Sequence, residues 1–185
     1  MNRFEVVVII IPINAITTKI SIKVNPSLFT FNIKDERLQN LPGISLFASV
    51  EVFTTKDRGV SRQKLKQLQS SGPILITHWG LSGPCILKLS AWGAREFHEL
   101  NHQFQLRINW LPSDNEESLV RKLDEMKRTH PKQLVFSNPI EGLPKRFWQS
   151  ILNHLEIQEQ LNWSSISKGQ VHALAQELCS GVFHV

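Results

Sequence analysis

The sequence lacks the glycine patterns with which proteins hold a dinucleotide. Its nine glycines include neither the G-x-G-x-x-G turn of a Rossmann fold nor the G-x-x-x-x-G-K-[ST] loop of a P-loop. A G-x-S-x-G nucleophile elbow is also absent. The chain therefore carries no complete machinery for binding a nucleotide cofactor or for catalysis, which predicts one domain, or a severed piece, of a larger enzyme.

Cysteine is scarce. The two cysteines, Cys85 and Cys179, are too far apart in sequence to form the C-x-x-C pair of a redox or zinc site. We expect both to be buried free thiols in a reducing cytoplasm, and the predicted localisation is cytoplasmic.

Long hydrophobic runs are missing as well. The apolar run Val6 to Ile11 has six residues and stops at Pro12, whereas a secretory signal needs roughly 7 to 15. No later run approaches the roughly 20 apolar residues of a membrane span, so no membrane partner is expected. A buried strand accounts for the run better.

The excess of positive charge is modest. Lys and Arg number 21 against 16 Asp and Glu, a net charge of +5. Basic residues gather between Lys56 and Lys66, within a polar segment from Thr54 to Gly72 that reads as a loop or short helix. No aromatic residues interleave them, so no nucleic-acid partner is expected.

Alternating apolar residues make the first half of the chain rich in strands. The predicted strands are Thr18–Val24, Ser27–Ile33, Ile44–Phe53, Ile74–Thr77 and Gln103–Trp110. Gly80 to Pro84 reads as a turn feeding a helix that ends near Leu100, with Ser82 as N-cap and Pro84 in the first turn. The core face of this helix should pass through Ile86, Leu89, Gly93 and Phe97.

The second half is predicted to be helical. Ser113 to Glu116 has the pattern of a capping box before one helix, and a second helix begins near Pro144. The last helix should begin near Ser167, capped with Gln170, and end at Gly181. The predicted class is α+β, with strands over residues 26–112 and helices over 113–180.

One short motif suggests zinc chemistry. His98, Glu99 and His102 spell H-E-x-x-H, in which two histidines one helical turn apart bind zinc and the glutamate acts as base. The helix should end before the second histidine, however, and no convincing third ligand follows. We therefore expect surface histidines and no metal, with a zinc hydrolase as the minor alternative.

The segment from Thr77 to Pro84 offers a second candidate site. It places two glycines and a proline in one short connection, which favours a close approach of the backbone to a ligand. The start of a helix there would suit an anion or an electron-rich ring edge. An ordinary link between strand and helix is the alternative.

At these residues the sequence resembles a family of FAD-dependent oxidoreductases, the aminoacetone oxidase type, also called BaiN-like. The family's T-H-x-G-L-S-G-P-x-x-L-x-x-S pattern is matched from Thr77 to Ser90. Three further segments are similar to the family: Pro26 to Phe31, Leu41 to Ser45 and Leu143 to Trp148. The resemblance runs from about residue 26 to the C-terminus and leaves residues 1–25 as an unmatched extension.

The resemblance implies an insert domain made of a small β-barrel followed by a small helical bundle. It also implies a fragment, inactive alone, of an FAD-dependent and NAD(P)H-linked oxidoreductase, in which residues 181–185 begin the strand that returns to the FAD-binding domain. That domain, on the same or a neighbouring polypeptide, would be the partner. The residues implied to face its flavin or substrate are Thr77, His78, Gly80, Leu81, Ser82, Gly83 and Pro84. A freestanding interaction module or a decayed gene fragment is the alternative.

A first prediction concerns FAD. The purified chain should be colourless and retain no FAD, because it lacks a glycine-rich turn to hold the pyrophosphate. The absorbance spectrum after gel filtration in excess FAD checks this. A yellow protein with stoichiometric flavin would contradict it.

Overall fold

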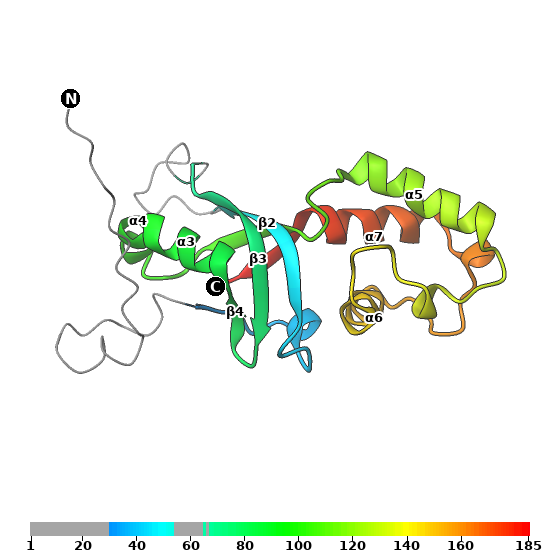
Figure 1. The fold of residues 1–185 in the computed structure, drawn as a ribbon, viewed down its shortest axis with the longest axis horizontal. Coiled ribbons are helices and arrows are strands. Elements are labelled where there is room, and N and C mark those ends of the chain that lie inside the picture. Colours follow the sequence, from blue (N-terminus) through cyan, green and yellow to red (C-terminus); the bar gives the residue numbers. More distant parts are fainter. Residues whose placement is uncertain (1–29, 54–64, 66) are drawn as a thin grey trace, which may run out of the picture.

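The computed structural model describes residues 30–53, 65 and 67–185, and confirms the α+β class. An antiparallel sheet that curves into a half-barrel stands beside a group of helices (Figure 1). The strands predicted at 6–11 and 18–24 lie outside the described residues, as does most of the polar segment 54–72.

The sheet has six strands in the described part of the chain, all paired antiparallel, in the order β1-β4-β3-β2-β5-β6. Their bounds are β1 Phe31–Asn32, β2 Ser45–Phe53, β3 Gln69–Thr77, β4 Gly80–Ser82, β5 Gln105–Asn109 and β6 Gly181–His184. The short helix η2 (Glu36–Leu38) lies between β1 and β2. Strands β1 and β6 are thus the two edges of the half-barrel.

Strict alternation of buried and less buried residues in β2 and β3 confirms the strand predicted from Ile44. Strand β3 begins at Gln69, five residues before the predicted Ile74. Its first half was missed because Ser70 and Gly72 occupy core positions without being apolar. An added Cβ at Gly72 would touch the Cβ of Cys85 at 3.7 Å, so a small residue brings the strand close to the next helix.

The helix predicted from Pro84 to Leu100 is two helices, α3 (Pro84–Trp92) and α4 (Ala94–Glu99). The predicted core residues Ile86, Leu89 and Phe97 are all buried. Gly93 separates the helices, and an added Cβ there would lie 2.5 Å from the ring of Phe97. The glycine therefore lets Phe97 pack against the break.

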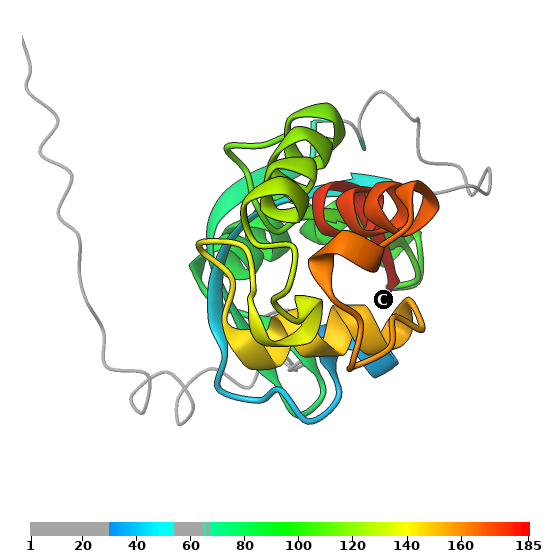
Figure 2. The same cartoon turned by 90° about the vertical axis from the view of Figure 1, so that its right-hand side faces the viewer.

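The remaining helices form the lobe on the right of Figure 1 and face the viewer in Figure 2. They are α5 (Glu116–Thr129), α6 (Lys145–His154) and α7 (Lys168–Ser180), with short helices η3 (Val135–Ser137) and η4 (Trp163–Ser165) between them. The capping box predicted on α7 is confirmed by the reciprocal hydrogen bonds of Ser167 and Gln170. The one predicted at Ser113 is wrong, since Asn115 and Ser118 form the box of α5. The Ser113 sequence matches the usual pattern, whereas the box that forms has Ser118 where that pattern has Glu or Gln.

Sheet and helices share one core. Trp110, directly after β5, is 1% exposed, and its ring lies 4.8 Å from that of Phe147 in α6 and 5.8 Å from that of Phe183 in β6. Its backbone N–H also donates to the carbonyl of Leu178 in α7 at 2.8 Å. The helical lobe is therefore fixed to the end of the sheet.

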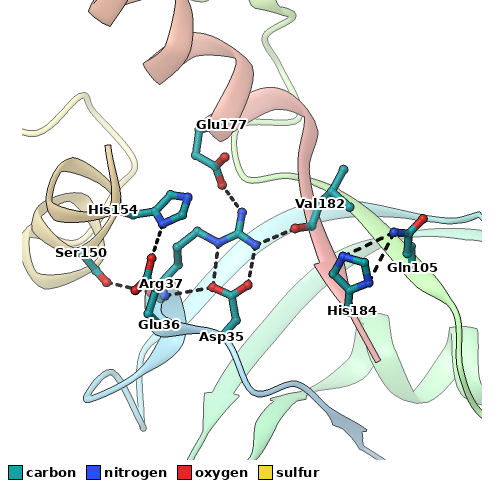
Figure 3. Close-up of polar contacts among 9 residues, drawn as sticks. All are labelled: Asp35, Glu36, Arg37, Gln105, Ser150, His154, Glu177, Val182 and His184. Atoms are coloured by element: carbon teal, nitrogen blue, oxygen red, sulfur yellow. Dashed lines mark hydrogen bonds and ion pairs between the residues drawn. The ribbon is translucent and has the colours of Figure 1, made fainter. Parts of the chain in front are cut away.

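The buried Arg37 of η2 connects the two edges of the half-barrel (Figure 3). Its guanidinium donates to Asp35 at 2.7 and 2.5 Å and to Glu177 of α7 at 2.5 Å. It also donates to the carbonyl of Val182 in β6 at 2.6 Å and lies 3.8 Å from the ring centre of Phe183. Arg37, which follows β1 in the chain, thus contacts β6 along the edge of β6 that no described strand pairs with.

In this cluster, ion pairs offset the free-energy cost of burying charged groups. Burial raises the pKa of Asp35, but hydrogen bonds and charge from Arg37 outweigh it and leave that pKa below its usual value. Because the folded pKa of Asp35 is lowered, its contribution to stability is present above the unfolded value of about 4 and is lost as the pH falls through the folded pKa.

We predict that Arg37→Met lowers the free energy of unfolding by about 3 kcal/mol, because two partly buried carboxylates would lose their partner. Urea unfolding measures the loss. The difference from the natural chain should shrink as the pH falls below about 4, because Asp35 becomes protonated in the folded natural chain and no longer pairs with Arg37.

Arg107→Met is the matched control. Arg107 pairs with Glu51 at 3.1 Å on the exposed face of the sheet, so its removal should cost under about 1 kcal/mol. Equal losses in the two variants would mean that Arg37 does not hold the edges together.

Candidate functional site

The candidate site lies on a hairpin made by β3 and β4, whose tip is at the lower end of the sheet in Figure 1. Thr77 pairs with Gly80, and the Thr77 hydroxyl donates to the carbonyl of Gly80 at 3.1 Å. His78 and Trp79 form the two-residue turn, and Trp79 is 55% exposed. A tight hairpin therefore presents two aromatic rings at its tip.

The structure divides the predicted site residues between two places. Thr77 and His78 are at the tip, whereas Gly83 and Pro84 are at the far end of β4. Leu81 is fully buried in the core, and Ser82 pairs with Leu75. The predicted turn over Gly80 to Pro84 is wrong in its first half, which is strand, because a strand of three residues is too short to show alternation.

Ser82 is not the N-cap of α3. The N-cap is Gly83, with no side-chain hydrogen bond, and Pro84 occupies the first turn as predicted. The start of α3 is also separated from the hairpin tip by the whole of β4. The helix end and the tip therefore do not form one ligand-binding turn.

Both glycines of the segment approach the protein's own backbone. Gly83 has φ +98°, and an added Cβ would lie 2.9 Å from both the Leu75 nitrogen and the Pro73 carbonyl oxygen. At Gly80 an added Cβ would lie 2.6 Å from the nitrogen of Ile33 and would overlap the carbonyl oxygen of Phe31. The close approach that the sequence suggested is thus accounted for by strand packing.

The outer face of the sheet has an apolar end near this hairpin. Phe47 of β2 pairs with Pro73 of β3, and Phe47 is 60% exposed. Leu75, two residues along β3 on the same face, is 38% exposed. Large apolar side chains in such a row favour contact with a further surface.

A polar cavity of about 480 Å³ adjoins the tip. Thr77 and His78 line one side of it, and Asn40 and Arg146 line the other. Arg146 belongs to the first turn of α6, so the cavity lies between the hairpin and the helical lobe.

The H-E-x-x-H residues lack the geometry of a zinc hydrolase. Helix α4 ends at Glu99, and His102 has φ +55°, so the two histidines do not share a helical face. Within the described ranges, no group of three or more His, Cys, Asp or Glu could hold a metal ion.

The two cysteines are free and buried, as predicted. Burial raises the pKa of Cys85. Burial, with the nearby charges of Asp114 and Glu116, raises the pKa of Cys179 to about 11. Both thiols are therefore protonated at neutral pH and unsuited to act as nucleophiles.

The fold and the hairpin define a class of protein, a half-barrel domain joined to a helical lobe. The chain belongs to the family of the HI0933-like protein barrel and H2TH domain, whose model matches residues 25–185. That family is associated with FAD flavoproteins, which confirms the resemblance at this level. No helix in the described part of the chain is long and apolar enough to cross a membrane.

Two curated relatives carry the name ribosomal RNA dihydrouridine synthase. The one from Escherichia coli is 33% identical over 112 residues, which is 60% of this chain and 22% of the relative. The one from Haemophilus influenzae is 26% identical over 147 residues, 79% of this chain and 31% of the relative. The chain thus spans less than a third of the relatives it matches.

Sequence reasoning missed Trp79 and Arg146. Trp79 could have been found, because a large aromatic residue beside a glycine in a two-residue turn has no core to enter. Arg146 lies in the family-like segment Leu143 to Trp148, but only the folded chain brings α6 beside the hairpin.

We predict that Gly83→Val lowers the free energy of unfolding by about 2 kcal/mol or more, because a side chain there would push β4 from β3. Urea unfolding measures this. Ser82→Val, on the outer face of β4, is the control and should change stability by less than about 1 kcal/mol. If Gly83→Val were as stable as the natural chain, contact with a ligand would again be the explanation for this glycine.

Proposed function

We propose that this chain is the substrate-side domain of an FAD-dependent oxidoreductase of the BaiN-like type. The tip of the β3–β4 hairpin contacts the flavin ring or the substrate held by an FAD-binding domain. The observation that carries the proposal is Trp79, more than half exposed on a tight turn in a chain of this family.

The exposed apolar end of the sheet supports a docked partner domain. Phe47 and Leu75 lie on the same face of the sheet, toward the end that carries the hairpin tip. Covering them would remove large apolar side chains from water, which stabilises association. The length of the relatives outside the matched region leaves room for such a domain.

The residues of this chain fit only part of FAD. In this proposal His78 and Trp79, exposed at the hairpin tip, contact the flat ring, and Thr77 orients a polar edge. Nothing in the sequence matches the glycine-rich turn that holds the pyrophosphate, so that part of the cofactor belongs to the partner domain. Reduced flavin supplies hydride chemistry when bound.

The substrate we propose is a uracil base in ribosomal RNA. Both relatives are named for dihydrouridine synthesis in that RNA. Making dihydrouridine adds two electrons and two protons across one double bond of uracil, which is a reduction suited to flavin. An exposed tryptophan also suits a base, because bases stack on aromatic rings. The sequence predicted no nucleic-acid partner, and that prediction stays untested.

A chimera tests the proposal. Residues 25–185 would replace the matched region of the Escherichia coli relative, expressed in cells that lack that relative. We expect dihydrouridine to return to the ribosomal RNA, measured by mass spectrometry of its nucleosides. Trp79→Ala should lower the yield by about tenfold, the cost of losing one stacked ring.

Trp92→Ala is the matched control. Trp92 is 58% exposed, close to the 55% of Trp79, but it stands on α3 beside Lys88. Equal yields in the two variants would remove the hairpin tip from the site. A chimera that folds and binds flavin but forms no dihydrouridine would overturn the proposed substrate.

A further inference from the structure

A polar groove extends from the hairpin tip along α6 to its C-terminal end. Two cavities of about 480 Å³ each share Gln39, Asn40 and Arg146 as lining residues. One cavity reaches His78, and the other reaches Asn153 and His154. We call this continuous feature the Arg146 groove and define it by these six residues. Figures 1 and 2 both place the hairpin tip and the loop before β2 beside one another, next to α6.

Arg146 brings an uncompensated positive charge to the middle of the groove. Its guanidinium donates to the backbone carbonyl of Asn40, and it makes no ion pair with a described residue. Arg37, by contrast, has two carboxylate partners. Glu36 is the one acidic residue among those lining the two cavities, and His154 contacts it at 2.6 Å at the far end (Figure 3).

Neutral donors flank that charge. The side chains of Gln39, Asn40 and Asn153 are exposed and make no hydrogen bond to another described residue. Amide groups can donate to phosphate oxygens without adding charge. One arginine among amides suits the single charge of a phosphodiester, and arginine binds phosphate in a two-pronged geometry.

The walls of the groove are held in place. The Ser150 hydroxyl of α6 donates to the carbonyl of Arg37 at 2.8 Å, which fixes α6 to η2. The loop before β2 is tied to the hairpin, since Gly43 donates to the carbonyl of Ile76 and Ile76 donates to that of Ile44, both at 2.9 Å. A preformed groove loses little entropy when a ligand binds.

We propose that the Arg146 groove binds the phosphate backbone of single-stranded RNA next to the base that Trp79 contacts. The inference rests on the proposed function, because it takes RNA as the substrate. A positive charge in a groove that leads to an exposed aromatic ring is a combination that suits single-stranded nucleic acid. The rings of His78 and Trp79 lie 6.4 Å apart, so the groove and the ring meet at the tip.

Binding of RNA to the full chain, without flavin, tests the groove. The probe is a fluorescein-labelled oligouridine of about 12 nucleotides, followed by anisotropy at salt concentrations between about 50 and 200 mM. Arg146→Gln should weaken binding by roughly tenfold at the lowest salt, the usual worth of one charged hydrogen bond. The slope of log K against log salt should fall by about 0.7, the value for one lost phosphate contact.

Arg121→Gln is the matched control, since Arg121 is exposed on α5, outside both cavities, and the charge change is the same. Asn153→Asp is a second groove variant, which adds a negative charge at an exposed position and should weaken binding similarly. Circular dichroism confirms that each variant is folded.

Three results would overturn the groove: no binding of oligouridine by the natural chain, equal effects of Arg146→Gln and Arg121→Gln, or unchanged binding by a folded Asn153→Asp. The last two results would mean that RNA binds to a different face of the chain, or that the groove binds a protein. The binding measurement involves neither flavin nor turnover. Failure of the groove can therefore be distinguished from failure of the proposed function, which would appear as an inactive chimera. A chimera active on RNA with an unimportant Arg146 would leave the proposed function and remove only the groove.

Discussion

The architecture depends on how Arg37 closes the half-barrel. The sheet ends at β1 on one side and β6 on the other, and an open edge leaves backbone carbonyls without partners. Arg37 follows β1 in the chain and donates to the carbonyl of Val182 in β6. Its pairing with Asp35 and Glu177 makes burial of the charge tolerable, and Glu177 extends the contact to α7. A single side chain therefore joins the segment that follows β1 to the edge strand β6 and to α7.

Alternation of residues along the strands gives the sheet two unlike faces. The inner face carries the core residues of every strand and meets α3, while the outer face pairs Ser49 with Ser71 and Arg107 with Glu51 at one end. The other end carries Phe47 and Leu75, which are 60% and 38% exposed. An exposed apolar patch of this kind suits contact with a second surface.

Local patterns predicted the regular elements and failed where small residues carried the structure. Strand patterns identified all of β5 and β2, and the capping box at Ser167 identified the start of α7. Ser70 and Gly72 hid half of β3, and Gly80 to Ser82 read as a turn because glycine and serine favour turns in isolation. The Arg37 contacts join residues 140 and 145 positions apart, so no local pattern could reveal them. The candidate site was found at Thr77 and His78, but its second wall, Arg146, follows only from the folded arrangement.

The groove follows from the same closure. The backbone of Arg37 accepts the hydroxyl of Ser150, so the residue that joins the sheet edges also positions α6. The loop that leaves η2 then has to reach β2 beside the hairpin, and Gly43 and Ile44 fasten it to Ile76. Asn40, in that loop, has φ +60° and offers its carbonyl to Arg146. The hairpin is hydrogen-bonded to the loop through Ile76, and the loop to α6 through Arg146, so the charge of Arg146 stands at a set position relative to Trp79. A substrate that bound both would therefore be oriented by the fold itself, without movement of either wall.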